Sequence, residues 1–233
     1  MTDARPRDIA LELDQYRAGW TTPRAAAVAG ILFSLLLITS LVLIRMTVPA
    51  DPQDAGAWLS GGAGVANLAL HLLPFAGIAF LWFIGVLRDR LGQHEDKLFA
   101  TVFFGSGLLF LALLFASAAI AGGLLRMYRS NTRLLIDSGL YTFGRTVTYE
   151  MLNVYTLKMA GVFMISTCTL SLRTGIIARW MAYLGLVLAL FLLLSLGRFS
   201  WAPLVFPLWV FLISVHILRT NLGRSGQSIP VGG

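Results

Sequence analysis

Five polar side chains interrupt apolar segments of the sequence at positions where they could bind a solute, an ion or a proton. Asn67 and His71 lie four residues apart, on one face of a helix, and Glu150, Asn153 and Lys158 follow in a later apolar segment. A charged side chain at mid-bilayer costs about 2.5–3.5 kcal/mol on the insertion scale, so each requires a reason. If the two segments are neighbours, their depths predict one polar pocket in the outer half of the membrane.

A structural interpretation of the same residues stays open. Lys158 can extend toward the headgroups, Glu150 can lie among them, and His71 can donate a hydrogen bond to the backbone of a neighbouring helix. These alternatives differ in where Lys158 points and in whether the two segments are adjacent.

Three arginines form a second candidate site. Arg126, Arg129 and Arg133 are spaced three and four residues apart, so they form a basic stripe if the preceding helix continues past the membrane. Such a stripe can bind an anion, a lipid phosphate or an acidic partner. Ordinary anchoring of a helix end to headgroups is the structural alternative.

Small residues recur on one face of the third apolar segment. Their spacing is typical of a helix face that a neighbouring helix approaches closely, within the chain or in a homo-oligomer. The residues are Gly105, Ala112, Ala116, Ala119 and Gly123.

No familiar catalytic or metal-binding constellation is present. His71 and His216 fall about 12 Å apart in depth, so they cannot ligate one haem. Cys168 is the single cysteine, and three scattered histidines supply no converging ligand set. Phosphate-binding loops, nucleophile elbows and H-E-x-x-H motifs are missing. We therefore expect no catalytic residues, no metal and no cofactor.

The composition determines which elements must position these residues. The chain has 233 residues, of which 57% are hydrophobic and 12% charged, values that exclude a water-soluble domain of this size. The net charge of +7 is a topology signal in such a chain, and nucleic acid is not an expected partner. The sequence predicts an all-α polytopic membrane helix bundle whose principal partner is the lipid bilayer.

Six segments are apolar over roughly the 20 residues that a transmembrane helix needs. Basic residues are more frequent in the connections on the side of the N-terminus, so both termini are predicted to be cytoplasmic. The segments are Ala25–Met46, Gly64–Leu87, Leu98–Leu125, Val147–Leu172, Ala178–Leu196 and Trp201–Leu218.

These boundaries divide the chain into a cytoplasmic N-terminal segment (1–24), a six-span domain (25–218) and a short cytoplasmic tail (219–233). Thr22 and Pro23 are typical of a helix start, which predicts that the first span begins there. Apolar residues at helical spacing over residues 7–20 indicate either a short helix on the inner membrane surface or a polar tail.

Two stretches, Leu81–Gly92 and Gly175–Leu186, resemble uncharacterised six-span bacterial inner-membrane proteins of the domain-of-unknown-function type. The resemblance implies this architecture and location in the bacterial cytoplasmic membrane, and it implies no active-site residues. Our first hypothesis is a non-enzymatic accessory or assembly partner in the membrane, acting with a membrane-protein partner or as a homo-oligomer. The alternatives are a small-solute or ion transporter that uses the outer-half pocket, and an intramembrane enzyme.

Overall fold

Long apolar segments become helices in this chain because lipid offers the backbone no hydrogen-bond partners. The computed structural model describes residues 6–48, 59–91, 97–175, 178–195, 199 and 201–225. It describes side chains over residues 25–48, 61–88, 100–175, 178–195, 199 and 201–220. Within these ranges every regular element is helical.

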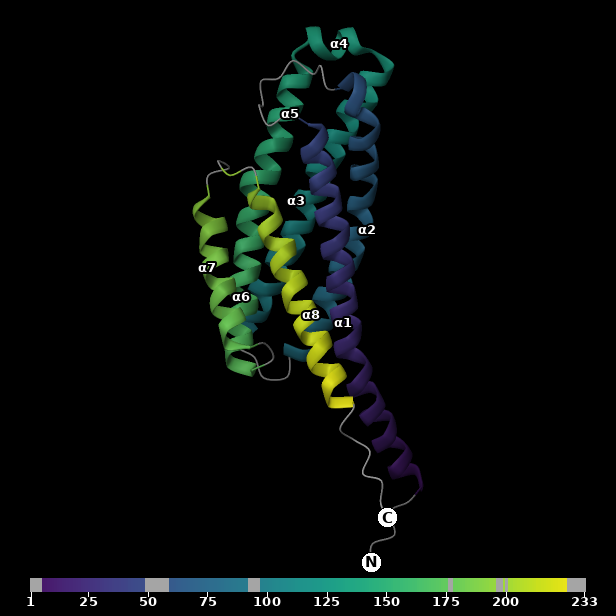
Figure 1. Cartoon of the computed structure of the whole chain (residues 1–233), viewed down its shortest axis with the longest axis vertical. Coiled ribbons are helices and arrows are strands. Elements are labelled where there is room, and N and C mark those ends of the chain that lie inside the picture. Colours follow the sequence, from purple (N-terminus) through teal and green to yellow (C-terminus); the bar gives the residue numbers. More distant parts are fainter. Residues whose placement is uncertain are drawn as a thin grey trace, which may run out of the picture.

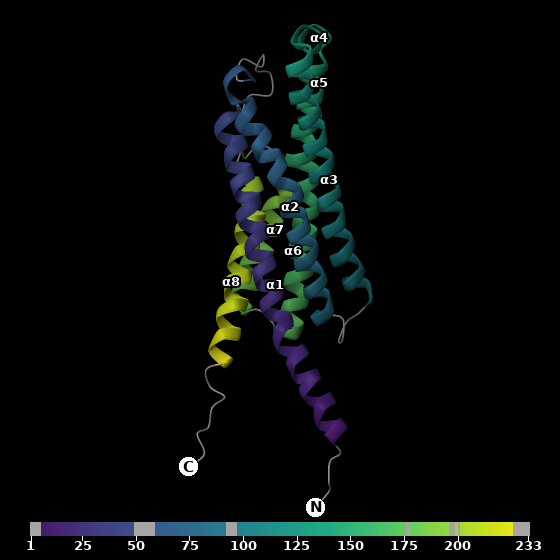
Figure 2. The ribbon, with the colours of Figure 1, turned by 90° about the vertical axis from the view of Figure 1, so that its right-hand side faces the viewer.

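Each of the first three helices runs antiparallel to the one before it. They are α1 (Pro6–Thr47), α2 (Leu59–Leu91) and α3 (Lys97–Ser130). Figure 1 shows α1 and α2 side by side along much of their length, and Figure 2 shows α3 on the far side of α2. Pro74 lies inside α2 without ending it.

A short helix reverses the chain at the upper end of the bundle, which we call the α4 end (Figure 1). Helix α4 (Thr132–Asp137) begins where Asn131 Oδ1 accepts a hydrogen bond from the amide of Leu134 at 3.1 Å. Gly139, at φ +71°, provides the left-handed turn into the next helix. That helix comprises α5 (Leu140–Glu150), a π-helical turn η1 (Met151–Thr156) and α6 (Leu157–Thr174).

The last two helices, α7 and α8, each reverse the direction of the chain. Gly175, at φ +67°, ends α6, and α7 (Arg179–Leu194) packs against α6. A 3-10 turn η2 (Ala202–Leu204) then leads into α8 (Val205–Ser225), which packs along α1. The start of α1 and the end of α8 lie at the same end of the bundle, opposite α4 (Figures 1 and 2).

Five helical segments are long and apolar enough to cross a membrane: Ala25–Thr47, Gly61–Arg88, Ala100–Ser130, Leu140–Thr174 and Ala202–Thr220. They coincide with five of the six predicted spans, and the chain is a multi-pass helical membrane protein. The remaining predicted span is helical as α7, but it has only 16 residues. That length gives about 24 Å, which is less than the ~30 Å hydrocarbon layer.

The predicted helix start at Thr22 and Pro23 is wrong, although the long apolar segment does begin at Ala25, as predicted for the first span. Helix α1 begins at Pro6 and passes through Thr22 and Pro23 without a break. A proline removes only one backbone donor, so it need not end a helix whose flanking residues favour one. Residues 7–20 therefore form part of α1 rather than a separate helix, and their location on the membrane surface stays a prediction. Of the predicted tail, residues 226–233 lie outside the described residues.

Phenylalanine rings hold the centre of the bundle together. Phe80 on α2 lies within 6.1 Å of five other rings, measured between centroids. Among them, Phe33 of α1 is at 4.5 Å, Phe110 of α3 and Phe163 of α6 are both at 5.3 Å, and Phe206 at the start of α8 is at 5.7 Å. All of these side chains are buried, so one cluster joins five helices.

Neighbouring helices approach α3 closely at small residues that do not belong to the predicted stripe. A Cβ added at Gly107 on α3 would lie 2.6 Å from Ile84 Cδ1 and 3.2 Å from the Phe163 ring. A Cβ at Gly105 or Gly123 would meet nothing within 4 Å. Of the other stripe residues, Ala112 and Ala119 are exposed and Ala116 is half-buried. This face of α3 has no close neighbour at its two glycines, and packing through it stays a prediction for a partner outside the chain.

The contrast between two neighbouring glycines gives a matched test of this packing. We expect Gly107→Val to lower the free energy of unfolding by about 1–3 kcal/mol, because the added atoms enter filled space. Gly105→Val has the same intrinsic effect on the helix but enters open space, so its unfolding temperature stays close to that of the wild type. Thermal unfolding in detergent measures both, and equal losses in the two variants would contradict the packing described here.

Candidate functional site

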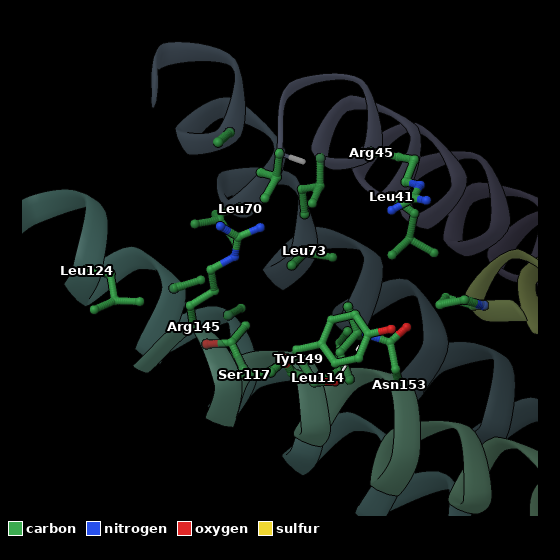
Figure 3. A pocket seen from close by; sticks show the side chains of 18 of the residues that line it. Leu41, Arg45, Leu70, Leu73, Leu114, Ser117, Leu124, Arg145, Tyr149 and Asn153 are labelled. Atoms are coloured by element: carbon green, nitrogen blue, oxygen red, sulfur yellow. Dashed lines mark hydrogen bonds between the residues drawn. The ribbon is translucent and has the colours of Figure 1, made fainter. Parts of the chain in front are cut away.

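A cavity of about 190 Å³ lies at the α4 end, between α1, α2, α3 and the α5–η1 segment. It is partly enclosed, and most of its walls are apolar, with Leu41 of α1, Leu73 of α2 and Leu114 of α3 among them (Figure 3). One side is closed by Trp201, Pro203 and Leu204, in and next to the turn η2 that precedes α8. Five elements that are distant in the sequence thus create one hollow within the bundle.

Arg145 of α5 brings a positive charge into this apolar surrounding. Its side chain is only 9% exposed, and it projects into the space between α2 and α3 (Figure 3). Arg145 Nη1 donates a hydrogen bond to Tyr141 Oη at 3.0 Å, one helical turn earlier. The guanidinium carbon also lies 5.9 Å from the centre of the Tyr141 ring. Tyr141 therefore orients the guanidinium, a planar group whose N–H donors match the geometry of a carboxylate or a phosphate.

The π-helical turn η1 forms the lower part of the same wall. Such turns are rare, occur mostly singly within α-helices, and are frequent at functional sites. Here Asn153 lies in the turn and lines the cavity beside Tyr149 (Figure 3). Asn153 Nδ2 donates to the Tyr149 carbonyl at 3.0 Å, and Thr156 Oγ1 donates to the Met151 carbonyl at 2.7 Å. The widened backbone is thus satisfied by the side chains of its own segment.

A second arginine borders the cavity from the opposite side. Arg45 lies in the last turn of α1, and its guanidinium is 5.7 Å from the centre of the Trp201 ring. Figure 3 shows Arg45 and Arg145 reaching toward the cavity from different helices. The described lining residues include no Asp or Glu. Two guanidinium groups above apolar walls favour a ligand with an acidic group and a hydrocarbon part.

The structure distributes the five residues of the predicted polar pocket over several places. Asn153 lines the cavity, whereas Glu150 is exposed. Asn67 and His71 line a groove on another face of α2. Lys158 lies on α6 and contacts the end of α7. His71 therefore lies on a different face of α2 from the one that lines the cavity, and it does not meet Asn153 there.

Lys158 caps the C-terminus of α7. Its Nζ donates to the carbonyl of Leu193 and, at 3.1 Å, to the carbonyl of Ser195. The Ser195 amide bonds the Phe191 carbonyl at 2.9 Å, and Ser195 Oγ donates to the Leu192 carbonyl at 3.2 Å. The last carbonyls of a helix have no partners in the helix itself, and a positive charge is favourable there. A lysine that sequence reasoning assigned to a solute pocket thus stabilises a helix end.

The groove outside α2 and α3 joins two of the predicted sets. Asn67 and His71 line it from α2, and Arg126 and Arg129 line it from α3. Arg133 follows the break at Asn131 and lies on α4, so the three arginines do not continue along one helix. The groove and the cavity lie back to back, because Leu70, Ala118 and Leu125 line both of them. We call these three side chains the shared wall.

The main residue missed at the sequence level is Arg145. A signal was present, since Tyr141, Arg145 and Tyr149 are spaced four residues apart and therefore lie on one helix face. All three line the cavity. Arg45 was counted only as a topology signal, because nothing in the sequence indicates that the ends of the first, fourth and sixth spans meet.

Comparison with known proteins gives no match for this chain. No family model matches it. No curated protein matches it either. The same holds for solved structures. The family resemblance in Leu81–Gly92 and Gly175–Leu186 is therefore not supported by these comparisons, and the site must be interpreted from its own geometry.

Removing the charge of Lys158 tests its capping role. We expect Lys158→Met, which keeps the hydrocarbon stem, to lower the free energy of unfolding by about 1–3 kcal/mol because carbonyl groups lose their donor. Amide hydrogen exchange should rise in the last turn of α7 more than in α2. The control is Glu150→Gln, at an exposed position of α5 in the same continuous helical segment as Lys158. It should change neither the free energy of unfolding nor the hydrogen exchange of α7. Unaltered exchange in the Lys158→Met variant would argue against the cap.

Proposed function

We propose that this chain is a six-pass protein of the bacterial inner membrane with both termini in the cytoplasm. The start of α1 and the end of α8 lie at the same end of the bundle, so the chain between them must cross the membrane an even number of times. Five long spans and α7 satisfy this requirement together. The short length of α7 is compatible with a crossing because Lys158 supplies donors to carbonyls at its end. The α4 end then faces the outside.

We further propose a non-enzymatic accessory role in which the protein binds an amphiphile with an acidic headgroup. The observation that carries this proposal is the buried Arg145 within an otherwise mostly apolar cavity. Arginine stays positively charged, so it holds an anion well but does not transfer protons. A cavity of about 150 Å³ accepts a benzene ring. The cavity here, at about 190 Å³, therefore accommodates a ring or a short stretch of acyl chain.

The transporter alternative receives less support from the geometry. It relied on one pocket lined by Asn67, His71, Glu150, Asn153 and Lys158, and these side chains face different surroundings. The hydrogen bonds that Lys158 donates to α7 also give it a structural role. Binding in the cavity uses residues that are already brought together, and it requires no further rearrangement.

The six-pass arrangement can be tested by labelling single cysteines in a Cys168→Ser background. Thr174→Cys, at the end of α6, and Thr220→Cys, on α8, should react with a membrane-impermeant maleimide only after the cells are permeabilised. Ser138→Cys near α4 and Phe199→Cys between α7 and α8 should react in intact cells. All four positions are exposed. Reaction of Thr174→Cys and Phe199→Cys from the same side would show that α7 does not cross.

Ligand binding can be tested with radiolabelled benzoate, which has one ring and one carboxylate, and protein in phosphatidylcholine nanodiscs. We expect Arg145→Gln to weaken binding about tenfold or more, because a charge-assisted hydrogen bond is worth about 1.5–3 kcal/mol. Arg145→Lys should bind with intermediate affinity, since it keeps the charge without the planar fork. Ala121→Phe fills the cavity while keeping Arg145, and it should also abolish binding.

Arg133→Gln is the matched control for this experiment. It removes the same charge from an exposed position on α4 that does not line the cavity. Its affinity should equal that of the wild type. Wild-type affinity in both Arg145→Gln and Ala121→Phe would refute the cavity as the binding site.

A further inference from the structure

The groove outside α2 and α3 is separate from the cavity and has its own chemistry. Its volume is about 690 Å³, which is larger than that of the cavity. At its polar part it carries Arg126 and Arg129 from α3, together with Asn67 and His71 from α2. Elsewhere the lining is apolar. Such a combination of a charged part and a hydrocarbon part resembles the two parts of a lipid molecule.

The two arginines lie on one surface of α3. They are three residues apart in the last helical turns before Ser130, so their side chains are neighbours on the helix, and both are exposed. Guanidinium groups bind phosphate oxygens through parallel N–H donors. Basic residues near a membrane surface attract anionic lipids by about 1 kcal/mol each.

His71 is held at the edge of this groove by its own helix. Its Nδ1 lies 2.6 Å from the carbonyl oxygen of Asn67. Because a carbonyl oxygen can only accept, Nδ1 carries the proton and donates it. The ring is thereby fixed in an exposed position beside the groove that Arg126 and Arg129 also line. The polar part thus consists of side chains from both helices.

Small residues and two aromatic rings shape the apolar part. A Cβ added at Gly122 would meet nothing within 4 Å, and Ala119 on the same face is exposed. Phe115 lies against α2 where Gly77 has no side chain, since a Cβ at Gly77 would be 2.1 Å from Phe115 Cζ. Phe115 and Phe75 thus border a channel along the face of α3 that carries Ala119 and Gly122. This channel has the apolar lining that an acyl chain requires.

We propose that the groove binds an anionic phospholipid from the leaflet at the α4 end. The lipid phosphate binds to Arg126 and Arg129, and an acyl chain lies against Ala119, Gly122 and Phe115. Charge complementarity selects an anionic headgroup, and the apolar channel selects a lipid over a free phosphate ion, which would leave the channel unfilled. A second copy of the chain would place its own arginines next to these, which is electrostatically unfavourable.

The proposal is tested by native mass spectrometry of the full chain in detergent with added phosphatidylglycerol. We expect the wild type to retain bound phosphatidylglycerol in preference to phosphatidylcholine. Arg126→Gln/Arg129→Gln should lower the apparent affinity for phosphatidylglycerol about tenfold or more. Gly122→Leu, which fills the channel and keeps both arginines, should lower it as well. Inorganic phosphate should not displace the lipid.

Arg133→Gln is the matched control, because it removes an exposed arginine of the same end without touching the groove. Lipid retention in this variant should equal that of the wild type. The proposal is overturned if Arg126→Gln/Arg129→Gln and Gly122→Leu retain as much phosphatidylglycerol as the wild type. It is also overturned if Arg133→Gln loses as much phosphatidylglycerol as the double variant, or if inorganic phosphate displaces the lipid. Detection of a dimer without bound lipid, with the groove covered by the second copy, would overturn it as well.

Discussion

Hydrocarbon offers no hydrogen bonds to a polypeptide, and this constraint explains both the regular and the irregular parts of the bundle. Several hydroxyl groups inside the spans bond to their own helices, as Thr167 does to the Phe163 carbonyl at 2.7 Å and Ser34 to the Gly30 carbonyl at 2.7 Å. Where a helix ends or widens, side chains replace the missing backbone partners. Lys158 does so at the end of α7, and Thr156 does so within η1. Irregular backbone is found where such side chains are available.

The same solvent also changes what holds helices together. Lipid tails are as apolar as leucine, so helices in a membrane associate through packing rather than through removal of apolar surface from water. The phenylalanine cluster around Phe80 supplies such packing for five helices at once. Gly107 and Gly185 contribute by leaving room for the side chains of neighbouring helices. Above this cluster the helices enclose the cavity rather than a filled core.

Helix positions were largely predictable from the sequence because apolar length is a local property. Five of six spans were located in this way. What could not be predicted is which face of each helix meets a neighbour. The small-residue face of α3 matched a packing pattern, yet its glycines meet no neighbour and Gly107, on another face, carries the contact. Lys158 likewise required knowledge of where α7 ends in space.

The candidate site was predicted only in part, for the same reason. Asn153 was identified, but Arg145 was not, although the spacing of Tyr141, Arg145 and Tyr149 was visible. Asn67, His71, Arg126 and Arg129 were identified as two separate sets. That they line a single groove depends on the relative rotation of α2 and α3, which no local pattern encodes.

The shared wall makes the two hollows mechanically dependent on each other. Leu70, Ala118 and Leu125 form a partition one side chain thick, so a displacement that enlarges one compartment shrinks the other. If the groove and the cavity each hold a ligand as proposed, a ligand that displaces these side chains on one side changes the free energy of binding on the other side. Thermodynamic reciprocity then requires an equal effect in the opposite direction. The two proposed binding sites are then coupled through the three side chains of the shared wall.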